Sequence, residues 1–182
     1  MRHPKIPSVY LTHQLNVLSG NTTWLSSKWH QYVIKRFDEC WVPDYDNDKN
    51  LSGLLGQVNQ KLKSVNYIGP LSRFNKQSIE QPIDILVLLS GPEPQRTLLE
   101  KKLLLLLKKD KRNIVFIRGL VENQQKVIEI GKIKLWNYMT SKQLETLINS
   151  SKFIISRSGY TTIMDLAKLG KKAIFIPTPG QF

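Results

Sequence analysis

The sequence has little cysteine, little acidic charge and no long apolar run. Cys40 is the only cysteine among 182 residues, so the chain can form no intramolecular disulfide and no cysteine-based metal cluster. This usage fits a reducing compartment. The longest apolar runs, such as residues 103–107, are far too short to cross a bilayer, and the first residues contain no signal-peptide core. We expect a cytoplasmic protein, soluble or peripheral at the inner face of the membrane.

Basic residues outnumber the scarce acidic ones. The chain has 27 lysines and arginines against 14 aspartates and glutamates, a net charge of +13. Such a balance favours an anionic partner, which can be a nucleic acid, a phosphorylated small molecule or an acidic membrane. Charge alone does not choose among the three. A hydrophobic content of 41% is enough for a domain with a real core.

Strands and helices alternate in the second part of the chain. Apolar runs predict strands over residues 83–90, 113–119, 133–136, 153–156 and 173–177. Helices are expected over residues 95–109, 141–151 and 162–169. Thr140 and Gln143 have the spacing of a capping box, and Gly170 stands where the last helix should end. The pattern predicts an α/β fold, with a Rossmann-like parallel sheet and helices on both faces.

The first 75 residues have a different pattern. They predict strands over residues 8–11 and 39–43, and between them a helix over residues 21–37 with its apolar side chains on one side. These elements are too few to close a core, so we expect residues 1–75 to be the remnant of a domain whose beginning is missing. Residues 76–182 end on a strand that no helix covers, which predicts that this domain is also incomplete.

Ligands of open parallel sheets bind at the carboxyl ends of the strands, so the loops there are of interest. The loop "SGPEP", residues 90–94, follows the first strand of the second part. Its glycine permits a phosphate to approach the backbone, and the amides of the next helix can hold an anion. Its two prolines lack amide donors, so an ordinary tight turn is the alternative.

The stretch "SRSGYTTIMD", residues 156–165, combines small and hydroxylated residues with one carboxylate. Gly159 permits close backbone approach, and Ser158, Thr161 and Thr162 carry hydroxyl groups. Asp165, expected in the first helical turn, can accept hydrogen bonds from two ribose hydroxyls. A plain helix start is the alternative, because Thr162 and Asp165 also have capping spacing.

A third loop carries aromatic side chains. Trp136 ends the strand expected over residues 133–136, and Tyr138 comes two residues later. An exposed ring at this place can stack on a base, whereas a buried one simply packs. None of the three loops decides the function alone.

Together the segments "IDILVLLSGPEP", "IKLWNYM" and "SRSGYTTIMDLAKLGKKAIFIPTPGQ" resemble the C-terminal donor-binding domain of glycosyltransferase family 28. This family includes the N-acetylglucosaminyltransferase that forms lipid II. The most specific part is the series of a small-residue turn, an acidic helix residue, a glycine stop and the strand "AIFIP". Upstream, "IPSVYLTHQLNVLSGNTTWL" resembles the end of the family's acceptor domain, and "YIGPLSR" resembles its interdomain connection.

The resemblance implies the GT-B fold, two facing Rossmann-like domains. It implies inverting transfer of a hexose or N-acetylhexosamine from a nucleoside diphosphate donor, expected to be UDP-linked, without a metal or other cofactor. The acceptor would be an unknown sugar or a lipid-linked one. For a lipid-linked acceptor, the segment "KKLLLLLKKDKR", residues 101–112, would contact an anionic membrane, although a core helix with a basic end is the alternative.

Position by position, the resemblance also implies site residues. Arg73 would approach the donor phosphates, Ser90 and Gly91 would form the phosphate loop, and the Trp136 backbone would meet the uracil edge. Ser158, Gly159, Tyr160, Thr161 and Thr162 would line the diphosphate and sugar, and Asp165 would bind the ribose. His13, a candidate catalytic base, and Asn16 would lie on the acceptor side. All are present in the sequence at these numbers.

Some features depart from the family pattern. The phosphate loop has fewer glycines, and Tyr160 stands where the family usually has a small residue, which would narrow the sugar pocket. The N-terminal region that supplies the family's glycine-rich loop and a catalytic base has no counterpart in these residues, nor has the family's donor-binding glutamine segment. We therefore expect a fragment that binds nucleotide weakly and does not turn over. The alternatives are an epimerase of the same fold, a non-catalytic subunit of a split transferase and, more distantly, a nucleic-acid-binding module.

Overall fold

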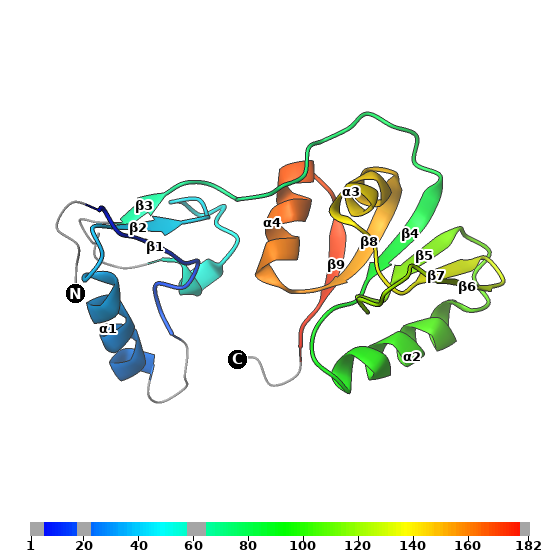
Figure 1. Cartoon of the computed structure of the whole chain (residues 1–182), viewed down its shortest axis with the longest axis horizontal. Coiled ribbons are helices and arrows are strands. Elements are labelled where there is room, and N and C mark those ends of the chain that lie inside the picture. The colour runs from blue at the N-terminus through cyan, green and yellow to red at the C-terminus, as the bar shows by residue number, and fades with distance from the viewer. Residues whose placement is uncertain (1–5, 18–22, 58–64, 179–182) are drawn as a thin grey trace. The chain divides into compact units, whose positions relative to one another are not determined.

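A computed structural model of the chain describes residues 6–17, 23–57 and 65–178 (Figure 1). It divides into two compact units, residues 1–71 and residues 72–181. The division into domains at residues 75 and 76, which the sequence suggests, stays a prediction. The interpretation of the first unit as the remnant of an acceptor-side domain stays a prediction.

The first unit is built on a small parallel sheet. Its strands are β1 (Val9–Leu11), β2 (Glu39–Val42) and β3 (Val65–Tyr67), in the order β1-β2-β3. The helix α1 (Thr23–Ile34) joins β1 to β2, and a short 3-10 turn, η2 (Gly53–Leu55), lies between β2 and β3. The sequence predicted β1, α1 and β2 but not β3, because that strand follows a polar, turn-rich segment.

The helix α1 buries few of its side chains. Of its residues only Ile34 is buried, while Trp24, Trp29 and Tyr32 are at least 58% exposed. Ile34 packs into a cluster with three other buried side chains, Leu15, Cys40 and Val42. Strands of three and four residues offer a surface too small to cover a whole helix.

The buried carboxylate of Asp44 organises the segment after β2. It accepts hydrogen bonds from the backbone amides of Tyr45, Leu51 and Ser52 at 2.7–2.9 Å, and from the Ser52 hydroxyl. Burial raises the pKa of Asp44, but these hydrogen bonds together outweigh that effect and leave the pKa below its usual value. The loop over residues 44–52 is therefore folded around the carboxylate of Asp44.

We expect the Asp44→Ala substitution to lower the free energy of unfolding of the first unit by about 3 kcal/mol, because it leaves three amides without their acceptor. Urea unfolding followed by tryptophan fluorescence is the measurement, since Trp24, Trp29 and Trp41 all lie in this unit. Asp48→Ala, in the exposed part of the same loop, is the control. An equal effect of the two substitutions would contradict the central role of Asp44.

The second unit is built on a six-stranded sheet in the order β6-β7-β5-β4-β8-β9. The strands are β4 (Ile83–Leu88), β5 (Ile114–Ile117), β6 (Val127–Ile130), β7 (Ile133–Trp136), β8 (Ser151–Arg157) and β9 (Ala173–Ile176). All neighbours are parallel except β6, which pairs antiparallel with β7 at the edge. β6 and β7 are joined by a short turn at Gly131 and Lys132 and form a hairpin.

Helices cover both faces of this sheet, as the sequence predicted (Figure 1). On one face α2 (Gln95–Leu107) packs through Leu103 on Ile85 and Val87. On the other face α3 (Ser141–Asn149) and α4 (Tyr160–Leu169) pack on Leu86 and Ile154. Because successive residues of β4 point to opposite faces, its apolar run supplies both cores.

Two helix ends match their sequence signals. The Thr140 hydroxyl accepts the Gln143 amide at 3.4 Å, and the Gln143 side chain accepts the Thr140 amide at 2.9 Å, which completes the capping box. Gly170 ends α4 in the left-handed conformation, with φ of 65°. Both signals are local, so the sequence alone was enough to find them.

Candidate functional site

The strand order places a candidate site at the carboxyl ends of β4 and β8. These strands are neighbours, but the chain leaves β4 for α2 on one face and leaves β8 for α4 on the other. Where connections diverge in this way, their loops cannot fill the space between them, and a crevice opens at that edge. The loops "SGPEP" and "RSGYTT" border this edge.

The start of α4 differs from the capping prediction. The helix begins at Tyr160 with Gly159 as its N-cap, and no side chain caps it. The pairing of Thr162 with Asp165 as a cap is therefore wrong, and Asp165 lies in the second helical turn. Gly159 therefore offers no side-chain oxygen to the first turn of α4, which begins at the edge where an anion can bind.

Glycine at position 159 is not required by the fold. Its φ of −66° and ψ of 132° suit any residue, and an added β-carbon would meet only the Thr162 hydroxyl oxygen, at 3.9 Å. Gly159 therefore leaves open space at the start of α4.

Asp165 places a carboxylate beside this helix start. The side chain is buried, and the Ser72 hydroxyl donates a hydrogen bond to its Oδ1 at 2.6 Å. Burial raises the pKa of Asp165, and the Ser72 hydrogen bond and the Arg73 charge oppose this in part. A desolvated carboxylate with an incomplete set of donors is suited to accept ligand hydroxyls.

A cavity of about 230 Å³ lies at the same edge. Ser90, Thr162 and Asp165, three of the residues named from the sequence, line it together with Ser156 and Tyr138. Its remaining lining is largely apolar, from residues such as Leu88, Ile117, Met139 and Leu144. The cavity thus combines an apolar wall with a few polar groups, as small-molecule sites usually do.

Gly119 also lines this cavity and was missed from the sequence. It has φ of 70°, and an added β-carbon would lie 2.8 Å from the Leu89 carbonyl oxygen. The loops after β4 and β5 therefore cross in close contact. No local signal marks this contact, because the two residues meet only in the folded sheet.

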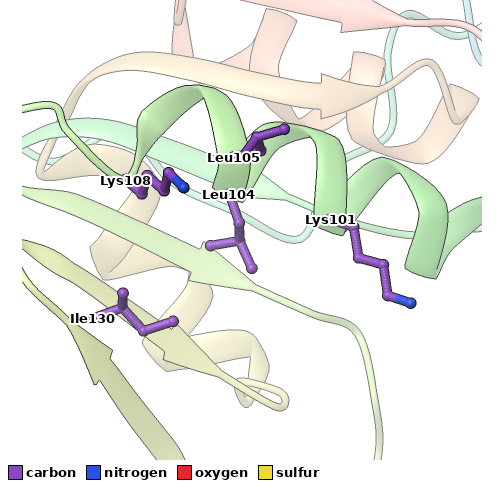
Figure 2. Close-up of a pocket in the computed structure, with 5 residues that line it drawn as sticks. All are labelled: Lys101, Leu104, Leu105, Lys108 and Ile130. Atoms are coloured by element: carbon purple, nitrogen blue, oxygen red, sulfur yellow. The ribbon is translucent and has the colours of Figure 1, made fainter.

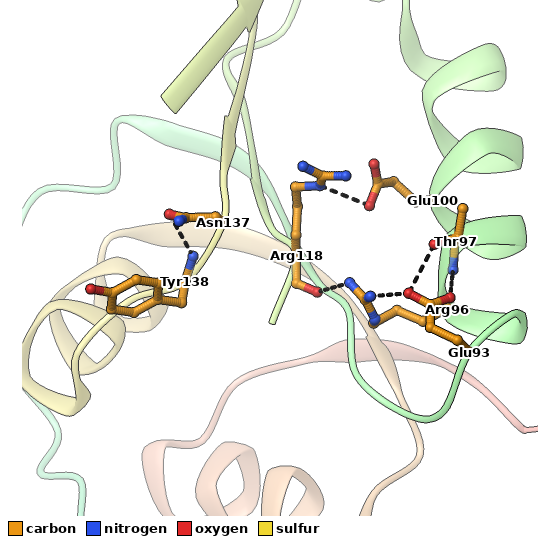
Figure 3. A network of polar contacts seen from close by, with 7 residues as sticks. All are labelled: Glu93, Arg96, Thr97, Glu100, Arg118, Asn137 and Tyr138. Carbon is orange, nitrogen blue, oxygen red and sulfur yellow. Dashed lines mark hydrogen bonds and ion pairs between the residues drawn. The ribbon is translucent and has the colours of Figure 1, made fainter. Parts of the chain in front are cut away.

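A partly buried ionic network adjoins the loop after β4 (Figure 3). Arg96 points from the first turn of α2 to the Arg118 carbonyl, 2.9 Å away, and also pairs with Glu93. Arg118 in turn contacts the buried Glu100 at 2.9 Å. The network ties the loops after β4 and β5 to the helix α2.

The loop itself presents its backbone to solvent. Ser90 and Gly91 are exposed, and the φ of 99° at Gly91 requires glycine. The alternative of an ordinary tight turn is compatible with these facts, so the assignment of a phosphate loop stays a prediction.

Trp136 belongs to the sheet. It pairs with Ile117 of β5 and Val127 of β6, and its carbonyl accepts the Arg118 amide at 2.9 Å. Its ring is half-buried against the core beneath α3 and α4. Contact of its backbone with a uracil edge stays a prediction, and the structure gives Tyr138 as the aromatic residue that lines the cavity.

Four further residues named from the sequence, Arg73, Tyr160, His13 and Asn16, do not line this cavity. Arg73 is exposed, with its guanidinium 5.1 Å from the centre of the Phe74 ring, and Tyr160 is half-buried at the start of α4. In the first unit, burial lowers the pKa of His13, and Asp44 partly opposes this. The Asn16 amide donates to the carbonyls of Leu54 and Gln57, so it holds η2 in place.

Metal-ligating clusters and membrane-spanning helices are both missing from the part of the chain that the structure describes. No group of three or more metal-ligating side chains gathers within residues 6–17, 23–57 and 65–178. In the same ranges, no helix has the length and apolarity needed to cross a membrane. Independence from metal and contact with a membrane surface both stay predictions.

Comparison with protein families gives one match. Residues 92–182, half of the chain, match the model described as glycosyltransferase family 28 C-terminal domain. No curated protein and no solved structure matches the chain. The likeness to the lipid II-forming member therefore stays a prediction.

Proposed function

Since the chain belongs to glycosyltransferase family 28, we propose that its second unit holds a nucleoside diphosphate sugar at the carboxyl edge between β4 and β8. The observation that carries the proposal is the meeting of three features there. The start of α4 lacks a side-chain cap, the buried Asp165 carboxylate lies beside it, and a cavity of about 230 Å³ adjoins both. The family itself implies a nucleotide-sugar donor and an acceptor.

In this proposal each group binds one part of the donor. The amides at the start of α4 and the hydroxyls of Ser158, Thr161 and Thr162 face the diphosphate. Asp165 accepts hydrogen bonds from the ribose hydroxyls. The apolar wall and Tyr138 receive the base, which we propose to be uracil. Tyr160 narrows the space for the sugar.

The transfer that follows is inverting. The acceptor hydroxyl gives its proton to a base, and its oxygen forms a bond to the anomeric carbon on the face opposite the diphosphate. The bond from that carbon to the phosphate oxygen breaks, and its electron pair stays on the phosphate. The α4 amides stabilise the charge that grows there. His13 is the proposed base, and its lowered pKa keeps it neutral and able to accept a proton at pH 7.

Calorimetric titration of the chain with UDP, UDP-N-acetylglucosamine and GDP tests the donor site. We expect both uridine compounds to bind more tightly than GDP, and UDP-N-acetylglucosamine to remain chemically unchanged without an acceptor. Conversion of the sugar to its epimer would favour the epimerase instead. Failure of every nucleotide to bind, with salt-sensitive binding of oligonucleotides, would favour the nucleic-acid-binding module.

We also propose that α2 contacts an anionic membrane surface. Its buried side chains include Arg96 and Glu100, while Leu105 and Leu106 are 65% and 75% exposed. A shallow hollow lies beside this helix (Figure 2). Leu104 points toward Ile130 there, and Lys101 and Lys108 stand at the two ends of the hollow. Exposed leucines flanked by cations match the boundary between lipid tails and anionic head groups.

The double substitution of Leu105 and Leu106 by aspartate should reduce binding to vesicles of phosphatidylglycerol about tenfold, because it removes apolar contact and adds negative charge. Co-sedimentation with vesicles is the measurement. Ile174→Asp is a matched control, since Ile174 is 66% exposed in the same unit but lies on β9. Equal binding of the parent to phosphatidylcholine vesicles, or an unchanged double variant, would contradict the proposal.

A further inference from the structure

Arg157, the last residue of β8, carries a buried guanidinium. Its relative exposure is 3%, and its Nη1 donates a hydrogen bond to the Pro177 carbonyl at 3.0 Å. Its Nε and Nη2 are buried and have no hydrogen-bond partner among the residues that the structure describes. Unpaired buried donors of this kind are rare in proteins and call for an explanation.

The two unpaired nitrogens lie against the loop after β4. A β-carbon built on Gly91 would be 3.8 Å from both Nε and Nη2. Arg157 also pairs with Ile176 at the end of β9, and Pro177 follows that strand. The guanidinium is therefore the point where the carboxyl ends of β4, β8 and β9 meet, at the same edge as the start of α4.

The arrangement is unfavourable without an anion. A guanidinium stays protonated at all ordinary pH values, so it cannot escape the cost of burial by losing its charge. No carboxylate forms an ion pair with Arg157 within the described ranges. Unfavourable features that a fold retains are concentrated at functional sites.

The geometry of the unpaired edge indicates the ligand. The Nε and Nη2 hydrogens of one guanidinium point in parallel, a fork that matches two oxygens of one phosphate group. Gly91 places no side chain over this fork. A phosphate group at this place would also lie close to the exposed backbone of the loop at Gly91. Because glycine has no side chain, the phosphate oxygens can come near that backbone.

We propose that the Nε and Nη2 groups of Arg157 bind a phosphate group of the nucleoside diphosphate beside Gly91. This inference rests on the proposed function and assigns the cation that meets the leaving diphosphate. Arg73, the cation named from the sequence for this role, is exposed and lies over the Phe74 ring. The sequence assigned no role to Arg157, because its burial exists only in the folded sheet.

The test compares Arg157→Met with the parent chain. Methionine approaches the length of the arginine stem without its charge, so the thermal midpoint of the ligand-free protein should stay the same or rise. Affinity for UDP should fall about a hundredfold, since two charge-assisted hydrogen bonds are lost, while affinity for uridine should not change. Arg157→Lys keeps the charge without the fork and should give an intermediate loss. Calorimetry with UDP, uridine and pyrophosphate supplies the affinities.

The outcomes separate this inference from the proposed function. Equal binding of UDP by the parent and Arg157→Met would overturn the role of Arg157 while the donor site stands. A variant with a lower midpoint that also loses uridine binding would show a purely structural arginine and overturn the role as well. If the parent binds pyrophosphate through Arg157 but neither UDP nor uridine, the phosphate subsite stands and the nucleotide site fails.

Discussion

Asparagine in place of Asp165 should lower the affinity for UDP about a hundredfold without destabilising the ligand-free protein. The amide keeps an oxygen that can accept the Ser72 hydroxyl, which donates at 2.6 Å to the carboxylate. It loses the negative charge that strengthens hydrogen bonds to ribose hydroxyls. It also removes a buried charge, so the thermal midpoint near pH 7 should stay the same or rise.

The pH dependence of stability gives an independent readout of Asp165. Its pKa is raised in the folded state, mainly by burial, so the folded protein holds the proton more tightly than the unfolded chain does. The stabilising contribution of this group is complete below the unfolded pKa, about 4, and is lost as pH rises through the raised folded pKa. Asp165→Asn should abolish this part of the pH dependence.

Thermal midpoints measured from about pH 4 to pH 7, combined with UDP titration, check both effects. Glu129→Gln is a matched control, because the Glu129 side chain is 63% exposed in the same unit. A variant that binds UDP as tightly as the parent would show that the carboxylate does not contact the ribose. A large fall in the midpoint near pH 7 would assign Asp165 a structural role instead.

Alanine in place of Gly119 should lower the free energy of unfolding by about 3 kcal/mol. The residue has φ of 70°, which a side chain tolerates poorly, and its new methyl group would lie 2.8 Å from the Leu89 carbonyl oxygen. The clashing atom is a backbone oxygen, which cannot move aside as easily as the end of a flexible side chain. The loops after β4 and β5 would have to separate, which would change the wall of the cavity and weaken UDP binding as well.

Gly131→Ala is the matched control for this substitution. Gly131 has a similar φ of 61°, but an added β-carbon meets no atom within 4 Å. It should therefore show only the backbone strain, about 1 kcal/mol, and leave UDP binding unchanged. Urea unfolding of the two variants separates the clash from the strain. Equal destabilisation by both would mean that the contact with Leu89 relaxes at no cost.

The sequence predicted the features of the second unit that depend on neighbours along the chain. The apolar runs of β4, β5 and β8 mark buried strands, and alternation with helices marks a parallel sheet. Thr140 with Gln143 and the terminal Gly170 announce helix ends through local hydrogen bonds. This order of strands and helices also predicted which edge of the sheet carries the candidate site. Ser90, Thr162 and Asp165 line a cavity at that edge.

What the sequence did not predict depends on contacts between distant segments. The start of α4 was placed two residues late, because the capping spacing of Thr162 and Asp165 is a local pattern that the tertiary fold overrides. Asp165 instead receives its hydrogen bond from Ser72, far away in the chain. The burial of Arg157 and the close approach of Gly119 to Leu89 likewise exist only once the sheet has formed.

The two helices on one face of the sheet begin in opposite ways. At α3, Thr140 and Gln143 cap the helix completely, whereas α4 begins at a bare Gly159 with room for a side chain. A mutation of Gly159 to serine or aspartate would supply the missing cap and stabilise the helix. The new oxygen would occupy the place proposed for the phosphate. Attempts to make the protein more heat-resistant by filling this cap should therefore weaken the binding proposed for the start of α4.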